Sequence, residues 1–344
     1  MSNDIIARAV EILGAGGVVA LPTETVYGLA ADAANDTAVR RVYAIKGRPA
    51  DHPLIVHVPN AAQLPRYAAG DRTALNQLAE RFWPGPLTAI VIKAEAVSDI
   101  VTAGQRTVAL RIIDHPLTQA ILERFGRAVA APSANRFGRV SPTTAQHVRD
   151  DLGTDVDFVV DGGPARVGVE STIVDLTGAV PAILRAGVIG PTELGAALGV
   201  AVVTRIGGAV RAPGTLAAHY APRARVILVT AQELAAQAAR LAAAGQRVGL
   251  LTLPSAPHAA ARELYATLRA LDADGYDVVL TVLPPEGEAN AAVRDRLTRA
   301  AAGAAQRALA DPELCDEQQP GGEEQRAHEH ANRKRQHPGQ QDIS

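Results

Sequence analysis

Short apolar runs alternate along the first 200 residues with stretches in which apolar residues recur every three or four positions. The runs predict β-strands at 18–21, 54–58, 87–92, 107–113, 128–131, 156–160 and 172–176. The periodic stretches predict helices at 4–13, 36–45, 73–82 and 116–125. Because a helix does not separate every pair of strands, the pattern predicts an α/β fold with a mixed sheet.

A second pattern begins after a stretch rich in glycine, proline and alanine. We expect residues 1–200 to form the first domain and residues 201–222 to form a linker. Three strand–helix units follow within 223–310, which predicts a smaller α/β domain with a parallel, Rossmann-like sheet. Beyond this domain the apolar periodicity stops, and the polar tail 311–344 is expected to be disordered.

Composition restricts the class of protein. The chain has 344 residues, of which 47% are hydrophobic and 20% charged. Its net charge of −2 argues against a nucleic-acid binder that is basic over its whole surface. The one cysteine, Cys315, excludes a disulfide framework and a zinc site built from cysteines. We see no signal peptide and no membrane-spanning run, and we therefore expect a cytoplasmic protein without a membrane partner.

Several common catalytic motifs are missing from the sequence. It contains no P-loop, no G-x-S-x-G nucleophile elbow and no H-E-x-x-H zinc motif. We therefore looked for candidate chemistry in polar side chains that follow predicted strands, where ligands of α/β proteins usually bind.

Two polar clusters near the N-terminus fit a ligand site. Residues 22–29, PTETVYGL, include Thr25 and directly follow a predicted strand, although a turn with capping hydroxyls explains them equally well. Lys46 and Arg48 leave the end of a predicted helix together. Favourable pairing with the helix dipole explains one of these charges, whereas a phosphate clamp explains both.

Two predicted strands carry an ionisable side chain among apolar neighbours. His57 shares a face of its strand with Ile55, and a hydrogen-bonded core histidine is the simpler explanation. Arg111 lies in the strand at 107–113. Because a buried guanidinium without a partner is costly, Arg111 needs a carboxylate, either from the protein or from a ligand.

Further polar residues follow the later strands of this domain. They are Ser133, Asn135, Ser141, Ser171 and Arg185. Ser141 also suits the N-cap position before the polar stretch 145–151. Together with the cationic residues above, they indicate a site for a nucleotide or another phosphate and for a second ligand that bears a carboxylate.

The order of these motifs resembles that of the YrdC-like family. Eight blocks occur in the family's order over roughly residues 10–195: PTETVYGLA, KGRPADHPLIVHV, WPGPLT, TVALRI, APSAN, SPT, DGG and GVESTI. The later APGTLAAHYAP and the small α/β domain resemble the long, two-domain form of the family. The resemblance implies a twisted mixed sheet with a concave cavity. It also implies synthesis of threonylcarbamoyl-AMP from L-threonine, bicarbonate and ATP, for the threonylcarbamoyladenosine modification of tRNA.

The resemblance also implies roles for individual residues. L-threonine would be held by Thr25, His57, Arg111 and Ser171. ATP would be held by Lys46, Arg48, Ser133, Asn135, Ser141 and Arg185, with His52 and Thr107 close to the nucleotide. Lys46 and Arg48 would offset charge that develops on the phosphates, with Mg²⁺ arriving together with ATP and no metal bound by the protein. Tyr220 would fold back from the linker and close the site.

Three alternatives stay open at this point. A YrdC-like surface that binds double-stranded RNA without catalysis would use the same cations, although the net charge of −2 and the 3% of aromatic residues count against it. A related enzyme could carbamoylate another amino acid, because these residue types do not separate threonine from serine. The C-terminal domain could be structural, support the lid or dock a partner. The family implies a downstream tRNA threonylcarbamoyl transferase, and direct contact with tRNA is left open.

Overall fold

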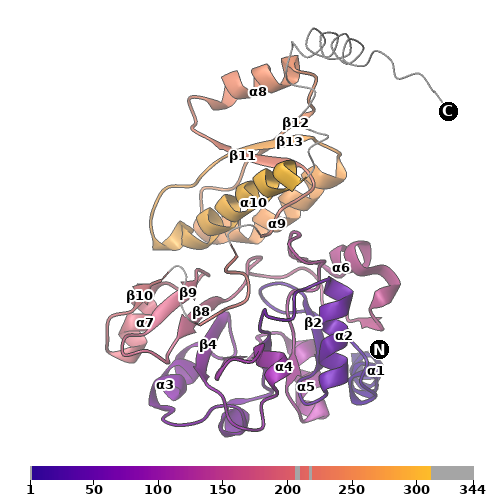
Figure 1. The fold of residues 1–344 in the computed structure, drawn as a ribbon, viewed down its shortest axis with the longest axis vertical. Coiled ribbons are helices and arrows are strands. Elements are labelled where there is room, and N and C mark those ends of the chain that lie inside the picture. Colours follow the sequence, from indigo (N-terminus) through magenta and orange to yellow (C-terminus); the bar gives the residue numbers. More distant parts are fainter. Residues whose placement is uncertain (1, 206–209, 217–218, 311–344) are drawn as a thin grey trace, which may run out of the picture. The chain divides into compact units, whose positions relative to one another are not determined.

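Figure 1 shows the fold in a computed structural model of the chain. The structure describes residues 2–205, 210–216 and 219–310, so the predicted tail 311–344 lies outside the described residues. One compact unit, which reaches Ala304, holds both sheets. Among the described helices, none has the length and apolar character needed to cross a bilayer.

A ten-stranded sheet forms the N-terminal part, and it is mixed, as the sequence pattern predicts. Its strands are β1 (Val19–Leu21), β2 (Gly28–Asp32), β3 (Ile55–His57), β4 (Leu87–Ile92), β5 (Thr107–Arg111), β6 (Val129–Ala130), β7 (Phe158–Val159), β8 (Thr172–Asp175), β9 (Ala182–Arg185) and β10 (Val203–Thr204). Their order is β10-β9-β8-β4-β5-β3-β6-β2-β1-β7. The pairs β3/β5, β4/β8, β1/β7 and β9/β10 are parallel, and the other pairs are antiparallel.

Helices cover the two faces of this sheet unequally. They are α1 (Ser2–Gly14), α2 (Asp36–Lys46), α3 (Thr73–Phe82), α4 (Asp99–Thr102), α5 (Pro116–Phe125), α6 (Ala145–Leu152) and α7 (Pro191–Leu198), with short 3₁₀ turns at Ala61–Arg66 and Gly153–Asp155. The main core joins one face to α2, α3, α4, α6 and α7. On the other face, α1 and α5 pack side by side over part of the sheet (Figure 1). The linker residue Ala212 packs on the remainder of that face.

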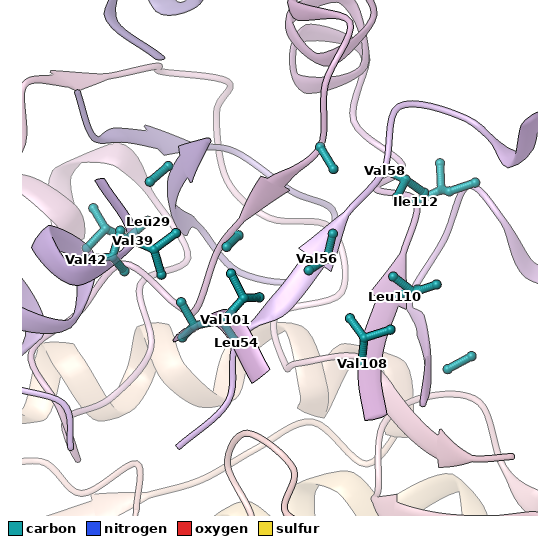
Figure 2. Close-up of a cluster of buried hydrophobic side chains, with 14 of the residues drawn as sticks. Leu29, Val39, Val42, Leu54, Val56, Val58, Val101, Val108, Leu110 and Ile112 are labelled. Atoms are coloured by element: carbon teal, nitrogen blue, oxygen red, sulfur yellow. The ribbon is translucent and has the colours of Figure 1, made fainter. Parts of the chain in front are cut away.

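Alternation along the central strands separates a packed face from a face available to ligands. Leu54, Val56 and Val58 lie in the main core (Figure 2), whereas Ile55 and His57 face the opposite side, as the sequence predicts. Burying one valine or leucine side chain contributes about 1.5–3 kcal/mol, and a slip of one residue would reverse every side chain. The core therefore determines which side chains of these strands face the cavity described below.

Several features of this domain differ from the prediction, since β2, β9, β10, α4, α6 and α7 are not among the predicted elements. The strand β2 was absent from the predicted elements, because its sequence GLAAD has no β-branched or aromatic residue; β2 therefore depends on pairing with its neighbours. The N-cap of α6 is Thr144, whose hydroxyl accepts a hydrogen bond from the His147 amide at 3.2 Å. Ser141 is not the cap, because its hydroxyl donates to Glu170 instead.

Three parallel strands form the second sheet, as predicted. They are β11 (Arg225–Val229), β12 (Val248–Leu251) and β13 (Val278–Val282), in the order β11-β13-β12. Helix α8 (Leu234–Ala243) packs on one face. Helices α9 (Pro257–Ala273) and α10 (Ala291–Ala310) pack on the other, and a 3₁₀ turn at Glu288–Asn290 precedes α10. Within the predicted linker, β10 still belongs to the first sheet, so the connecting segment starts only after Thr204.

Candidate active site

A cavity of about 50 Å³ lies where the second face of the large sheet meets the linker. Seven of the residues singled out in the sequence line it: Thr25, Arg48, His57, Arg111, Ser133, Arg185 and Tyr220. The other six, which are all described residues, do not line it: Lys46, His52, Thr107, Asn135, Ser141 and Ser171. The lining also includes the hydroxyl of Thr23 and the carboxylate of Glu170, so cationic, anionic and hydroxyl groups meet in one place.

Arg111 has a carboxylate partner within the protein. Its Nη2 donates to Glu24 Oε1 at 2.7 Å and to Thr25 Oγ1 at 2.9 Å, and its Nε donates to Gly85 O at 3.2 Å. Among the described residues, none accepts a hydrogen bond from Arg111 Nη1. The partner that the sequence demanded is therefore Glu24, and one nitrogen of the guanidinium stays available to a ligand.

The loop at 22–27 is held by its own hydroxyl groups. Thr23 Oγ1 donates to Val26 O at 2.6 Å and accepts from the backbone amides of Thr25 and Val26 at 3.0 and 3.1 Å. It also lies 2.8 Å from Thr25 Oγ1. The turn interpretation and the ligand interpretation of this cluster therefore both apply, because Thr23 shapes the turn while Thr25 lines the cavity.

His57 is buried and neutral. Its Nε2 lies 3.3 Å from Ala131 O, so Nε2 carries the proton and Nδ1 is the acceptor; this tautomer follows from the contact. Burial, followed by the charge of Arg111, lowers the pKa of His57 to about 3. No described residue bonds to Nδ1, which leaves it free to accept a hydrogen bond from a ligand.

Lys46 supports the cavity from behind. Its Nζ donates to Ser133 O at 2.6 Å and to Asn135 O, and Ser133 in turn lines the cavity. Burial, and then the charge of Arg48, lowers the pKa of Lys46 well below its usual value. Lys46 thus joins the end of α2 to the loop that follows β6.

Asn135 is fixed by its amide group. Its Nδ2 donates to Arg136 O at 2.7 Å and to Arg139 O at 3.0 Å, while its Oδ1 has no partner among the described residues. The Lys46 and Asn135 contacts together set the path of the loop at 133–139.

Arg48 lines the cavity directly. The left-handed Gly47 (φ 61°) ends α2, and Arg48 then turns back to donate from Nη2 to Pro53 O at 3.0 Å and from Nε to His52 O at 3.3 Å. Burial lowers the pKa of Arg48 to about 10, so the guanidinium keeps its charge at neutral pH. His52 itself packs edge-on against Phe137, with ring centres 5.6 Å apart.

Ser171 and Arg185 form a second buried group beside the cavity, which Arg185 lines. Arg185 donates from Nη2 to Ser171 Oγ at 3.0 Å, from Nε to Ser171 O at 3.1 Å and from Nη1 to the linker carbonyl of Pro213 at 3.0 Å. Ser171 Oγ also lies 2.8 Å from Thr88 Oγ1. Arg185 therefore ties the linker to the strand β8, and Ser171 acts behind the cavity wall.

Tyr220 and its neighbour His219 close the cavity from the linker side. Tyr220 is 1% exposed and has a positive φ of 60°, a strained conformation for a non-glycine residue. His219, which the sequence analysis passed over although it adjoins Tyr220, also lines the cavity and packs edge-on against Phe137. A Cβ atom at Gly214 would lie 2.1 Å from the Tyr220 hydroxyl, so Gly214 has to be glycine for the linker to close in this way.

Thr107 lies at the opposite end of its strand from Arg111. It begins β5 and shares a face with Arg111, which ends it. Four residues of strand separate the two by about 13 Å. The described part of the chain thus brings Thr107 onto the right face, but not into the cavity lining.

Comparison with known proteins agrees with this arrangement. A family model described as Telomere recombination (Sua5/YciO/YrdC) matches residues 11–187. A model described as the C-terminal domain of threonylcarbamoyl-AMP synthase matches residues 189–302. The curated threonylcarbamoyl-AMP synthase of Pyrococcus abyssi is 38% identical over 307 residues, which are 83% of this chain and 90% of the relative. That of Bacillus subtilis is 38% identical over 322 residues, which are 87% and 93%.

A solved structure shows the same two-domain fold. Sua5 of P. abyssi in complex with L-threonine matches with a TM-score of 0.84 at 36% identity, over 88% of this chain and 96% of that one. The resemblance noted in the sequence is thereby confirmed over both domains. The chain belongs to the Sua5/YciO/YrdC family and, within it, to the two-domain threonylcarbamoyl-AMP synthases.

Proposed function

We propose that the chain is a nucleotidyltransferase that condenses L-threonine, bicarbonate and ATP into threonylcarbamoyl-AMP and releases pyrophosphate. The observation that carries the proposal is that Arg111, a neutral His57, Arg48 and Ser133 line one cavity together. Family membership supports it, as does the L-threonine complex of the P. abyssi relative. The product would pass, in the cytoplasm, to a transferase that modifies tRNA to threonylcarbamoyladenosine.

The threonine end of the site would be built on Arg111, Thr25 and His57. Because Glu24 already balances the charge of Arg111, the substrate carboxylate would meet a directed hydrogen-bond donor, Nη1, rather than an uncompensated cation. His57 Nδ1 would accept a hydrogen bond from the hydroxyl or the amine of threonine. Ser171 would act from behind by holding Arg185.

The nucleotide end would be built on Arg48, Ser133 and Arg185, with Tyr220 over it. Arg48 keeps its charge and has a free Nη1 among the described residues, which suits a phosphate oxygen. Lys46 and Asn135 would hold the loop that presents Ser133, and Ser141 lies one contact farther back. His52 binds the lining through its backbone carbonyl, which accepts from Arg48 Nε. Among the described residues, the side chains of His52 and Thr107 have no hydrogen bond to the lining that would assign them a role.

The proposed reaction needs positioning more than a protein nucleophile. The amine of threonine and bicarbonate give a carbamate with loss of water. A carbamate oxygen attacks the α-phosphorus of ATP; the new phosphorus–oxygen bond forms as the bond to the bridging oxygen of the β-phosphate breaks, and pyrophosphate leaves. The protein contributes by holding the reactants together and by stabilising the charge on the phosphates.

A divalent cation such as Mg²⁺ would enter with ATP rather than bind to the protein. Among the described residues, no three or more His, Cys, Asp or Glu side chains are grouped as metal ligands. The nearby carboxylates are occupied, since Glu24 binds Arg111 and Glu170 binds Arg296. Mg²⁺ usually keeps several waters and binds through substrate phosphates, which fits this arrangement.

The linker would act as a lid over the site. Pro213, Gly214, His219 and Tyr220 all line the cavity, so the linker forms part of its wall. Outward movement of Gly214 and Tyr220 would open it, and their return would exclude water from the product, a labile mixed anhydride.

The RNA-binding alternative finds less support in the structure. Arg48, Arg111 and Arg185 are 8%, 4% and 5% exposed, and all three line the cavity. Cations that bind an RNA backbone need to reach the surface. A small anionic ligand therefore fits these side chains better than RNA does.

Pyrophosphate release from ATP tests the proposed function. The purified chain is incubated with ATP and Mg²⁺, and L-threonine or bicarbonate is left out in turn. We expect release only when both are present, and substitution of L-serine for L-threonine measures the selectivity. No release from the folded protein would favour the RNA-binding alternative, which a salt titration of RNA binding would then test.

A further inference from the structure

The C-terminal domain reaches the cavity wall through one buried arginine. Arg296 of α10 has a side chain that is 0% exposed. Its Nε donates to Glu170 Oε2 at 2.8 Å, and its Nη2 donates to Ala186 O at 3.0 Å. Its guanidinium carbon lies 4.9 Å from the centre of the Tyr220 ring. Arg296 therefore contacts both a residue of the cavity wall, Glu170, and the residue that closes the cavity, Tyr220.

Glu170 binds both Arg296 and Ser141. Its Oε1 accepts from Ser141 Oγ at 2.5 Å, and its Oε2 also accepts from the hydroxyl of Tyr265 in α9 at 2.9 Å. Burial by itself would raise the pKa of Glu170, but the charges of Arg296 and Arg185 outweigh burial and lower it to about 2. Since a carboxylate can only accept, the proton of the Ser141 hydroxyl has to point at Glu170.

A second pair of contacts fixes the same region from α9. Arg269 donates from Nε to the backbone carbonyl of Ser141 at 3.3 Å, while its two other nitrogens bind Asp151 at 3.1 and 2.5 Å. The ring of Tyr265 stacks on Tyr220, with centres 5.8 Å apart and planes 27° from parallel. The side chain and the backbone of Ser141, and the ring of Tyr220, are thus all held by the C-terminal domain.

Joining the two domains does not by itself explain why this contact is an ion pair, because replacing both partners of a buried pair by apolar residues of similar volume is often neutral for stability. Removing Arg296 alone would leave Glu170 uncompensated and would therefore also cost stability. A pair of this kind does, however, fix where its hydrogen-bond partners lie. The threonine end contrasts with this, because the hydrogen bonds of Arg111 and His57 all go to residues of the first domain.

We propose that Arg296 is a positioning residue for nucleotide binding: it orients Ser141 through Glu170 and holds Tyr220 by contact with its ring. The C-terminal domain would accordingly complete the nucleotide end of the site, while the first domain alone would form the threonine end. The inference rests on the proposed function, in that ATP is the ligand served by Ser141 and Tyr220.

Substitutions of Arg296 test this role against a merely structural one. Arg296→Met removes the charge and keeps an unbranched side chain, and Arg296→Lys keeps the charge but not the fork of donors. Arg294→Met is the matched control, because Arg294 lies on the same helix and its side chain, among the described residues, binds Pro284 and Glu286 of its own domain. For each variant we would measure ATP binding by calorimetry, KM for ATP and KM for threonine.

The expected result is a selective loss at the nucleotide end. Arg296→Met should raise the Kd and the KM for ATP roughly tenfold or more, as the loss of a hydrogen bond to a charged group predicts. It should change the KM for threonine by less than about threefold, because the contacts at the threonine end are not altered. Arg296→Lys should recover part of the ATP affinity, and Arg294→Met should match the unaltered protein.

Three outcomes would overturn the proposal: unchanged ATP binding in Arg296→Met, an equal rise of both KM values, or the same defect in Arg294→Met. If Arg296→Met does not fold, Tyr265→Phe replaces it, because it removes one hydrogen bond to Glu170 and keeps the stacked ring. Unchanged ATP binding in Tyr265→Phe would then contradict the proposal. ATP binding is measured directly, so a failure of the unaltered protein to make threonylcarbamoyl-AMP would contradict only the proposed function.

Discussion

Replacing Glu24 by Gln separates two roles of the Glu24–Arg111 pair, stability and substrate binding. The two side chains are 2% and 5% exposed, and Arg111 Nη2 lies 2.7 Å from Glu24 Oε1. Removing one partner of a buried ion pair costs about 3–5 kcal/mol, because the other charge is left uncompensated. Gln keeps an acceptor oxygen, so we expect Glu24→Gln to lose about 3 kcal/mol of unfolding free energy, the lower end of that range.

Arg111→Met removes the other partner and should destabilise the fold by a similar amount. The two variants should differ in their KM for threonine. In Glu24→Gln the guanidinium remains available, so the KM for threonine should change by less than about threefold. In Arg111→Met the carboxylates of Glu24 and of threonine would meet without a cation between them. The KM for threonine should then rise about thirtyfold, equivalent to about 2 kcal/mol.

Urea unfolding and steady-state kinetics on the same preparations measure both effects. The double variant, with both substitutions, should recover stability relative to either single variant but should keep the high KM for threonine, because no buried charge is left unpaired. An equal rise of the threonine KM in Glu24→Gln and in Arg111→Met would refute the reasoning. So would an unchanged KM in Arg111→Met.

Three further predictions follow from the contacts around the cavity. Lys46→Met should raise the KM for ATP about tenfold and the KM for threonine much less, because the carbonyls of Ser133 and Asn135 lose their donor; an equal rise of both KM values would count against it. Burial and the charge of Arg111 lower the pKa of His57 to about 3, against 6.5 for an exposed imidazole. Below pH 6.5 the unfolded chain binds a proton at His57 that the folded chain does not bind, so the unfolding free energy is highest above pH 6.5 and decreases as the pH falls toward 3. Between pH 7 and pH 5, His57→Gln should therefore lose about 2 kcal/mol less unfolding free energy than the unaltered protein, and equal losses would show that the imidazole is not buried neutral. Tyr220→Ala should weaken ATP binding and synthesis, and no change in either would rule out the closing role of the linker.

Local patterns in the sequence predict much of the first domain. The alternation around Val56 correctly assigns the packed face and the cavity face of β3, because one buried strand face requires a period of two. The strand β2 is missed because Gly28–Asp32 contains two alanines and no β-branched or aromatic residue, so its sequence carries no strand signal.

The pairing of charged residues depends on distances that a sequence does not contain. The apolar neighbours of Arg111 in its strand predict that it needs a carboxylate. They do not identify the partner, because Glu24 lies 87 residues away in the sequence. Glu170 and Arg296 are 126 residues apart and come from different domains. His219 could have been found from its place beside Tyr220 and between glycine- and proline-rich segments. The ligand roles of all these residues stay predictions until the variants are measured.

Transfer of labelled carbon from bicarbonate into a nucleotide product tests the central claim most directly. The chain is incubated with labelled bicarbonate, ATP, Mg²⁺ and L-threonine, and nucleotides are separated by chromatography. We predict a labelled adenylate that forms in equal amount to pyrophosphate and disappears when threonine is omitted or Arg111→Met replaces the unaltered protein. A folded protein that releases pyrophosphate without forming a labelled adenylate, or that forms none with all substrates present, would contradict the account.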